Sequence, residues 1–128
     1  MKLHLTTHGG KLTHFMSLST STLTNSFCQR MSKVDGTICS KCYARVYERM
    51  RSTLEEHLQR NSEILSRPLL DEELPFLGNI RYFRINSFGE LINYDHLNNI
   101  VRIAEHNPEV DITLYTKRAD LLVKLPYK

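Results

Sequence analysis

The cysteines constrain this chain more than any other feature, because all three lie between residues 27 and 44 of 128. Cys39 and Cys42 form a C-x-x-C knuckle, and Cys28 lies one loop upstream. A knuckle lets two thiolates approach one cation, and zinc prefers four ligands in a tetrahedron. We therefore predict a zinc site with Cys28, Cys39 and Cys42 as ligands and a fourth ligand elsewhere in the chain. An iron–sulfur cluster is the alternative cofactor.

The fourth ligand is expected among the six histidines. His14 is the first choice, because it lies shortly before the first cysteine on a predicted strand. His57 and Asp35 are the alternatives, and His57 lies on the apolar face of the helix predicted after the knuckle. Two other interpretations of the cysteines stay open. They are buried free thiols and a redox dithiol at a helix N-terminus.

The composition is that of an ordinary globular domain, with 41% hydrophobic and 24% charged residues. No apolar run approaches the roughly 18 residues of a membrane span, and residues 1–8 lack the apolar stretch of a signal peptide. A disulfide framework would leave one of three cysteines over, whereas clustered cysteines in a reducing cytosol are more often metal ligands. We expect one cytoplasmic domain over residues 1–128, without membrane association.

The first half of the chain predicts a hairpin followed by a long helix. Residues 2–6 and 12–19 are predicted strands around a glycine turn at residues 8–11. A Ser/Thr-rich loop over residues 19–25 leads to the cysteine stretch. Apolar residues then recur every three or four positions over residues 40–65, which predicts a single helix that starts at the zinc knuckle and ends before Pro68.

The second half predicts strand, helix, strand and helix. The strands cover residues 80–85 and 110–115, and the helices cover residues 93–106 and 119–124. A crossover helix of this length implies parallel strands with right-handed connections. The predicted fold class is a single metal-stapled α/β domain, with an N-terminal hairpin and a partial, barrel-like β-α-β-α unit.

No catalytic constellation stands out, and a glycine-rich phosphate loop is missing. The net charge of +3 is only mildly basic. Basic and aromatic residues cluster in and after the knuckle, and Arg and Tyr are favoured in protein interfaces. The predicted partner-binding residues are Lys41, Tyr43, Arg45, Tyr47, Arg49 and Arg51. The alternative is a solvated helix face, balanced by Glu48, Glu55 and Glu56.

The cysteine stretch resembles a known family, the phage gene product eighty-eight family. The resemblance begins at Cys28 and continues through Lys33, Val34, Gly36, Thr37, Ile38, Cys39, Cys42, Tyr43 and Ala44. Two later blocks agree in the same order, Tyr82-Phe83-Arg84 with Gly89-Glu90-Leu91 and His96-Leu97, and residues 112–116 with Lys117-Arg118. The agreement extends over roughly residues 16–120. It implies a metal- or cluster-binding protein with a barrel-like strand–helix pattern.

Two departures shape the functional expectation. Asn86 and Ser87 stand where family members tend to carry a His-Asp pair, and the chain supplies about three of the roughly eight strand–helix units of a barrel. We therefore expect the metal to be a structural staple and the protein not to be an enzyme. The expected function is inhibition of a host bacterial defence protein, as an anti-CRISPR protein acting on a CRISPR effector nuclease in the host cytoplasm.

The alternative function is a metal- or iron–sulfur-dependent enzyme of the radical or hydrolase type. The spacing of the cysteines argues against a radical enzyme, because the chain has C-x₁₀-C-x₂-C where radical enzymes have C-x₃-C-x₂-C. Direct nucleic-acid binding is a third, less favoured interpretation of the basic residues, and it would show a steep salt dependence.

Overall fold

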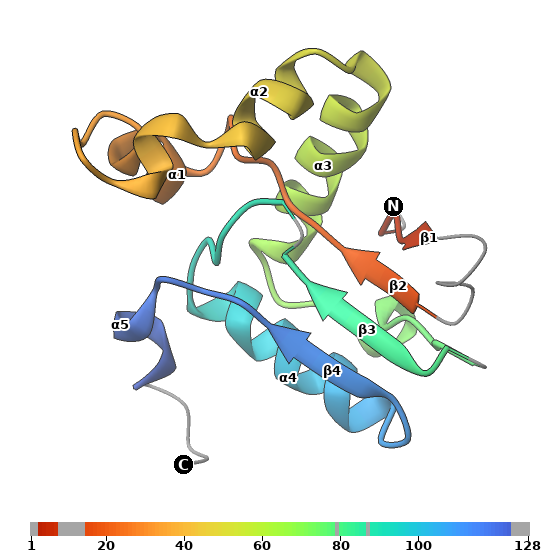
Figure 1. Cartoon of the computed structure of the whole chain (residues 1–128). Coiled ribbons are helices and arrows are strands. Elements are labelled where there is room, and N and C mark those ends of the chain that lie inside the picture. The colour runs from red at the N-terminus through yellow and green to blue at the C-terminus, as the bar shows by residue number, and fades with distance from the viewer. Residues whose placement is uncertain (1–2, 8–14, 79, 87, 124–128) are drawn as a thin grey trace.

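The computed structural model describes residues 3–7, 15–78, 80–86 and 88–123 (Figure 1). Within them, four strands form one sheet in the order β1-β2-β3-β4. The strands are β1 (Thr6–Thr7), β2 (Phe15–Leu18), β3 (Tyr82–Ile85) and β4 (Asp111–Leu114). β2, β3 and β4 run parallel, which confirms the predicted mixed α/β class. β1 pairs antiparallel with β2, and the predicted turn between them lies outside the described residues.

One face of the sheet is apolar because its strands alternate. On β3, Phe83 and Ile85 are buried, whereas Tyr82, the first residue of the strand, is exposed. The crossover helix α4 (Tyr94–His106) lies behind the sheet in Figure 1 and buries Leu97, Ile100 and Ile103 on the same core. Asn93 caps α4 by accepting a hydrogen bond from the His96 N–H. This packing carries the β-α-β unit that the sequence predicts.

The prediction of one helix over residues 40–65 is wrong. The chain instead forms a 3-10 turn η2 (Ile38–Lys41) and two helices, α2 (Tyr43–Arg49) and α3 (Ser52–Leu65). Arg51 between the helices has extended backbone, with φ of −130° and ψ of 98°. The break lets each helix bury its own residues, Glu48 on α2 and the Leu58–Leu65 face on α3. The helical periodicity was real but did not reveal the change of direction.

The remaining elements are short. α1 (Ser26–Met31) follows the N-cap Asn25, η3 (Asp71–Glu73) lies between α3 and β3, and α5 (Ala119–Leu122) follows β4. None of the helices in the described part of the chain has the length and apolar character needed to cross a bilayer.

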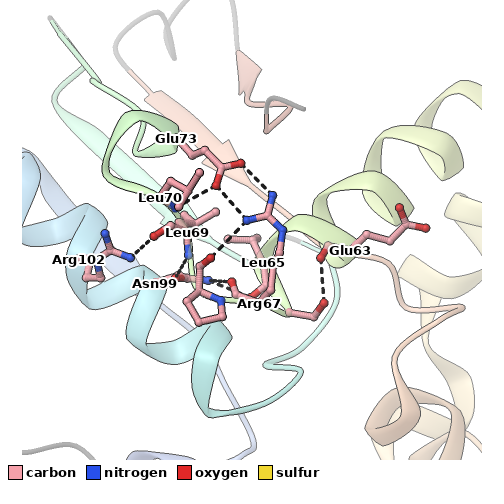
Figure 2. A network of polar contacts seen from close by, with 10 residues as sticks. Glu63, Leu65, Arg67, Leu69, Leu70, Glu73, Asn99 and Arg102 are labelled. Atoms are coloured by element: carbon pink, nitrogen blue, oxygen red, sulfur yellow. Dashed lines mark hydrogen bonds and ion pairs between the residues drawn. The ribbon is translucent and has the colours of Figure 1, made fainter.

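A polar network joins the end of α3 to α4 (Figure 2). The Asn99 side chain is fully buried, and its amide donates to the carbonyl oxygens of Leu65 at 3.0 Å and Arg67 at 2.8 Å. Its oxygen accepts from the Leu69 N–H at 3.0 Å. Beside it, Arg67 donates two hydrogen bonds to the Glu73 carboxylate. The Asn99 side chain thus fixes the turn after α3 to α4, and both its amide nitrogen and its oxygen are hydrogen-bonded.

Candidate functional site

A cavity of about 450 Å³ lies where β3 and β4 end, against the cysteine stretch. The three parallel arrows in Figure 1 point toward the side of the molecule where α1 and α5 lie. The carboxyl ends of parallel strands are where ligands bind in open α/β sheets. Sixteen residues line this cavity, hereafter the cysteine cavity: Thr22, Phe27, Cys28, Ser32, Cys39, Lys41, Cys42, Ala44, Arg45, Arg84, Asn86, Gly89, Glu90, Tyr115, Thr116 and Lys117.

All three cysteines are among these residues, each half-buried and free of disulfide bonds. Cys28 lies on α1, whose N-cap Asn25 accepts from the Cys28 N–H at 3.0 Å. Cys39 lies in η2, capped by Thr37, and Cys42 is the residue before α2. The capped elements α1 and η2, together with the residue that joins η2 to α2, therefore bring the thiols to one cavity.

The Cys28 thiol is held in its neutral form. Burial, together with the nearby Glu90, Cys42 and Cys39, raises the pKa of Cys28 to about 12, although Lys117 acts in the opposite direction. A cation that binds the sulfur would have to displace this proton, because thiolates and not thiols are metal ligands.

The ligands of the predicted zinc site are only partly brought together. No three His, Cys, Asp or Glu side chains of the described residues are grouped as in a metal site, so the zinc knuckle is not confirmed. His14, the first choice for the fourth ligand, lies outside the described residues. His57 stacks on His4 at 3.8 Å in a different cavity, and Asp35 is exposed on a turn. The chemistry of three thiols fits zinc or an iron–sulfur cluster.

Three side chains of the cysteine cavity carry unused polar atoms. The Nε atoms of Arg45 and Arg84 and both amide atoms of Asn86 are buried and have no hydrogen-bond partner in the described part of the chain. Arg84 places its guanidinium 5.0 Å from the centre of the Tyr115 ring. The sequence showed Asn86 only as a neutral replacement and Arg84 only as part of a strand. No signal in the sequence indicated that they share a cavity, because Asn86 follows the strand with a left-handed φ of 65°.

Glu90, by contrast, has its carboxylate fully engaged. It accepts hydrogen bonds from the N–H groups of Leu91 and Lys117, each at 2.8 Å, and from the Thr116 hydroxyl. Gly89 before it has φ of 86°, and a Cβ there would meet the Thr20 carbonyl oxygen at 2.5 Å. These contacts hold the loop after β3 against the ends of β2 and β4, and so they shape the cavity wall.

α2 is anchored to the same region by Glu48, which is fully buried. Its carboxylate accepts from the Ser21 hydroxyl at 2.5 Å, the Thr22 N–H at 2.8 Å and the Thr22 hydroxyl at 3.0 Å. The interpretation of Glu48 as part of a solvated face is therefore wrong. Residues 19–22 of the Ser/Thr-rich loop that follows β2 are buried as well, and polar groups of this stretch are paired with side chains of α2 and α3.

The predicted partner-binding residues line different hollows, although Lys41, Arg45 and Arg49 also share one on η2 and α2. Lys41 and Arg45 line the cysteine cavity. Tyr47 and Arg51 line a separate cavity between α2, α3 and the first strands, where the Arg51 guanidinium lies 4.3 Å from the Tyr47 ring centre. Arg49 is exposed on α2, and the Tyr43 side chain lies outside what the structure describes.

The chain matches a family of known proteins. The family model described as Gene product 88 matches residues 2–128, which is nearly the whole chain. No curated protein and no solved structure shows a significant match. The family match covers the cysteine stretch and every residue of the cysteine cavity.

Proposed function

The chain belongs to the phage gene product 88 family, as its sequence motifs indicated, and from this premise we propose that it binds a metal through Cys28, Cys39 and Cys42. The observation that supports the proposal is that α1, η2 and the junction of η2 with α2 bring the thiols to one cavity at the carboxyl ends of parallel strands. Zinc is the proposed ion, since thiolates are among its preferred ligands. An iron–sulfur cluster is the alternative, and it would favour the metal-dependent enzyme over a binding protein.

The position of the thiols supports a metal that faces a ligand, and not only the structural staple expected from the sequence. Structural zinc sites are closed by four protein ligands, whereas functional sites keep one position open. The cysteines supply three thiols on the wall of a cavity that has room for a small molecule. Whether a fourth protein ligand such as His14 closes the site is the question that separates the two roles.

Metal analysis of the purified full-length protein tests the proposal. We expect one zinc per chain, and a loss of the metal with a marked fall in Tm in Cys39→Ser and Cys42→Ser, because metal binding is coupled to folding. Met50→Ser is the control, since it removes another sulfur from an exposed position on the same segment. Metal-free wild-type protein after expression with added zinc or iron would refute the proposal. Brown colour with labile sulfide would identify a cluster.

A second candidate function is the docking on a host protein expected from the sequence. It is favoured by the exposed face of α2 and its C-cap, where Val46 is 58% and Met50 is 78% exposed on either side of the cationic Arg49. Apolar side chains next to an exposed guanidinium suit a protein interface. The proposed partner is a CRISPR effector nuclease of the bacterial host, which the protein would inhibit by direct binding.

The docking proposal is tested with purified effector nuclease. The double variant Arg49→Glu with Met50→Asp should lose inhibition of DNA cleavage and co-elution with the nuclease. The matched control is Arg81→Glu with Phe76→Asp, which makes the same kind of change at exposed residues away from α2. Wild-type protein that leaves cleavage unchanged at excess concentration would refute an anti-CRISPR role for the nuclease tested.

A further inference from the structure

We propose that the cysteine cavity binds a small molecule that carries an oxyanion, a carboxylate or a phosphate, beside the three thiols. The inference rests on the proposed function in that it assigns a ligand to the same cavity. Its recognition residues are different, however, and they are Arg84, Arg45 and Asn86. The two proposals can therefore fail independently.

The charge of the cavity favours an anion. Lys41, Arg45, Arg84 and Lys117 line it, and among the described residues of its lining only Glu90 carries a carboxylate. Glu90 is already engaged by two backbone N–H groups and the Thr116 hydroxyl. No ion pair joins Arg45 or Arg84 to a carboxylate of the described residues, and the buried Nε of each has no hydrogen-bond partner there. Both guanidinium groups can therefore bind an external oxyanion.

The unpaired amide of Asn86 points to the same conclusion. Its side chain is only 6% exposed, yet neither amide atom has a partner among the described residues. The other buried asparagines, Asn25, Asn61, Asn99 and Asn107, all hydrogen-bond through both side-chain atoms. A buried amide without partners lowers the stability of the fold. Asn86 differs in this respect from the four paired asparagines, and a bound ligand would supply the partner that its amide lacks.

Backbone geometry brings the recognition groups together. Arg84 lies on β3 and Asn86 directly follows its last residue, Ile85, and both side chains line the cysteine cavity. Asn86 has φ of 65°, a left-handed conformation that is uncommon away from glycine and is often found at functional sites. Arg45 approaches from α2, which Glu48 holds against the ends of the strands.

The size of the cavity limits the ligand to a small molecule. Its volume of about 450 Å³ lies within the range of small-molecule sites. Phe27, Ala44 and Tyr115 provide apolar wall beside the cations, so part of the ligand can be apolar. A polymer backbone would instead need an extended basic groove.

Calorimetric titration of the full-length protein, both as purified and after incubation with zinc, tests the proposal, with inorganic phosphate and acetate as probes in separate experiments. We expect saturable binding of at least one probe, and the tighter of the two identifies phosphate or carboxylate as the ligand group. Arg84→Gln and Asn86→Gly should weaken binding by about tenfold or more, because each removes hydrogen bonds to a charged group. Arg81→Gln is the matched control, since it removes an exposed charge at the opposite end of β3.

The outcomes separate this proposal from the metal proposal. Metal content and Tm are measured for each variant, and Arg84→Gln and Asn86→Gly should keep the metal and fold of the wild type. Absence of saturable binding of both probes, or equal weakening in Arg81→Gln, overturns the oxyanion site. Saturable binding with the expected variant pattern in a protein that takes up no metal would support the oxyanion site while refuting the metal proposal.

Discussion

Two buried asparagines show how differently this molecule treats polar groups. Asn99, at the junction of α3 and α4, is fully buried and makes three hydrogen bonds to backbone groups (Figure 2). Asn86, at the end of β3, is almost as buried, but its amide has no partner among the described residues. Asn99 has a structural role, because the backbone groups that it binds would otherwise be buried without hydrogen-bond partners. Asn86 faces a cavity.

The contrast extends to the surroundings of each residue. Near Asn99, the Arg67 guanidinium is paired with Glu73 and the Arg102 guanidinium with Asp71. In the cysteine cavity, the Nε atoms of Arg45 and Arg84 are buried and unpaired in the described part of the chain. Saturated polar groups stabilise the fold, whereas unsaturated ones cost stability until a ligand binds. Stability measurements can therefore test which region is structural.

The largest expected effect is the difference between Asn99→Ala and Asn86→Gly in urea unfolding. Asn99→Ala leaves buried backbone groups at Leu65 and Leu69 unpaired, and it should reduce the free energy of unfolding by about 3–5 kcal/mol. Asn86→Gly removes no hydrogen bond within the described chain and suits a positive φ, so the change should stay within about 1 kcal/mol. Each replacement suits its backbone, alanine in a helix and glycine in the left-handed region.

Equal destabilisation by the two variants would contradict the distinction. It would mean that the Asn86 amide has a hydrogen-bond partner within the protein and is not available to bind a ligand. Unfolding slopes should match the wild type in both variants, so that midpoints can be compared as stabilities.

The elements of the second half were predictable because local signals agreed there. The strand before residue 86, the helix capped at Asn93 and the strand before Tyr115 all follow from periodicity and caps. The three cysteines line one cavity, but among the described residues they are not grouped as in a metal site. Whether they hold a metal stays a prediction.

The first half was less predictable because long-range polar contacts decide it. The burial of Glu48 depends on donors from Ser21 and Thr22, which a charge pattern on one helix cannot reveal. These contacts fix α2 in a direction that α3 does not continue. Asn86 and Arg84 illustrate the same limit, because the unpaired state of a side chain is a property of the whole fold and not of its neighbours in sequence.

A smaller effect on stability is expected from His96, which combines the features of Asn99 and Asn86 because one of its ring nitrogens is hydrogen-bonded and the other is not. Its Nδ1 accepts from the Ile92 N–H at 3.1 Å, while its Nε2 is buried without a partner in the described residues. Burial lowers the pKa of His96 from 6.5 to about 4. The unfolded chain therefore binds more protons between these values, so stability is full above pH 6.5 and falls by up to about 3 kcal/mol as the pH drops to 4.

The measurement compares the pH dependence of unfolding in wild-type protein and His96→Asn. Asparagine offers an oxygen acceptor to the Ile92 N–H but does not titrate, so the loss of stability between pH 6.5 and 4 should be smaller in the variant. The variant itself will be less stable at pH 7, and the slope rather than the absolute value is the test. Identical slopes would show that His96 is hydrated or paired and does not resist protonation.

The smallest effect is expected at the rim of the saturated region, from the ion pair of Arg67 and Glu73 (Figure 2). The hydrogen bonds from Arg67 and the Leu70 N–H lower the pKa of Glu73 from 4.5 to about 2. The carboxylate thus stabilises the folded state above pH 4.5, and this contribution is lost as the pH falls toward 2.

Water and salt screen this pair because the Arg67 side chain is largely exposed. The Tm of Glu73→Gln should therefore be slightly below that of the wild type at pH 7, and the difference should vanish near pH 2. It should also shrink in 1 M salt, whereas the cost of Asn99→Ala should not. If the Tm difference between Glu73→Gln and the wild type changed with neither pH nor salt, Glu73 would instead have the same role as Asn99, a buried group that stabilises the turn after α3.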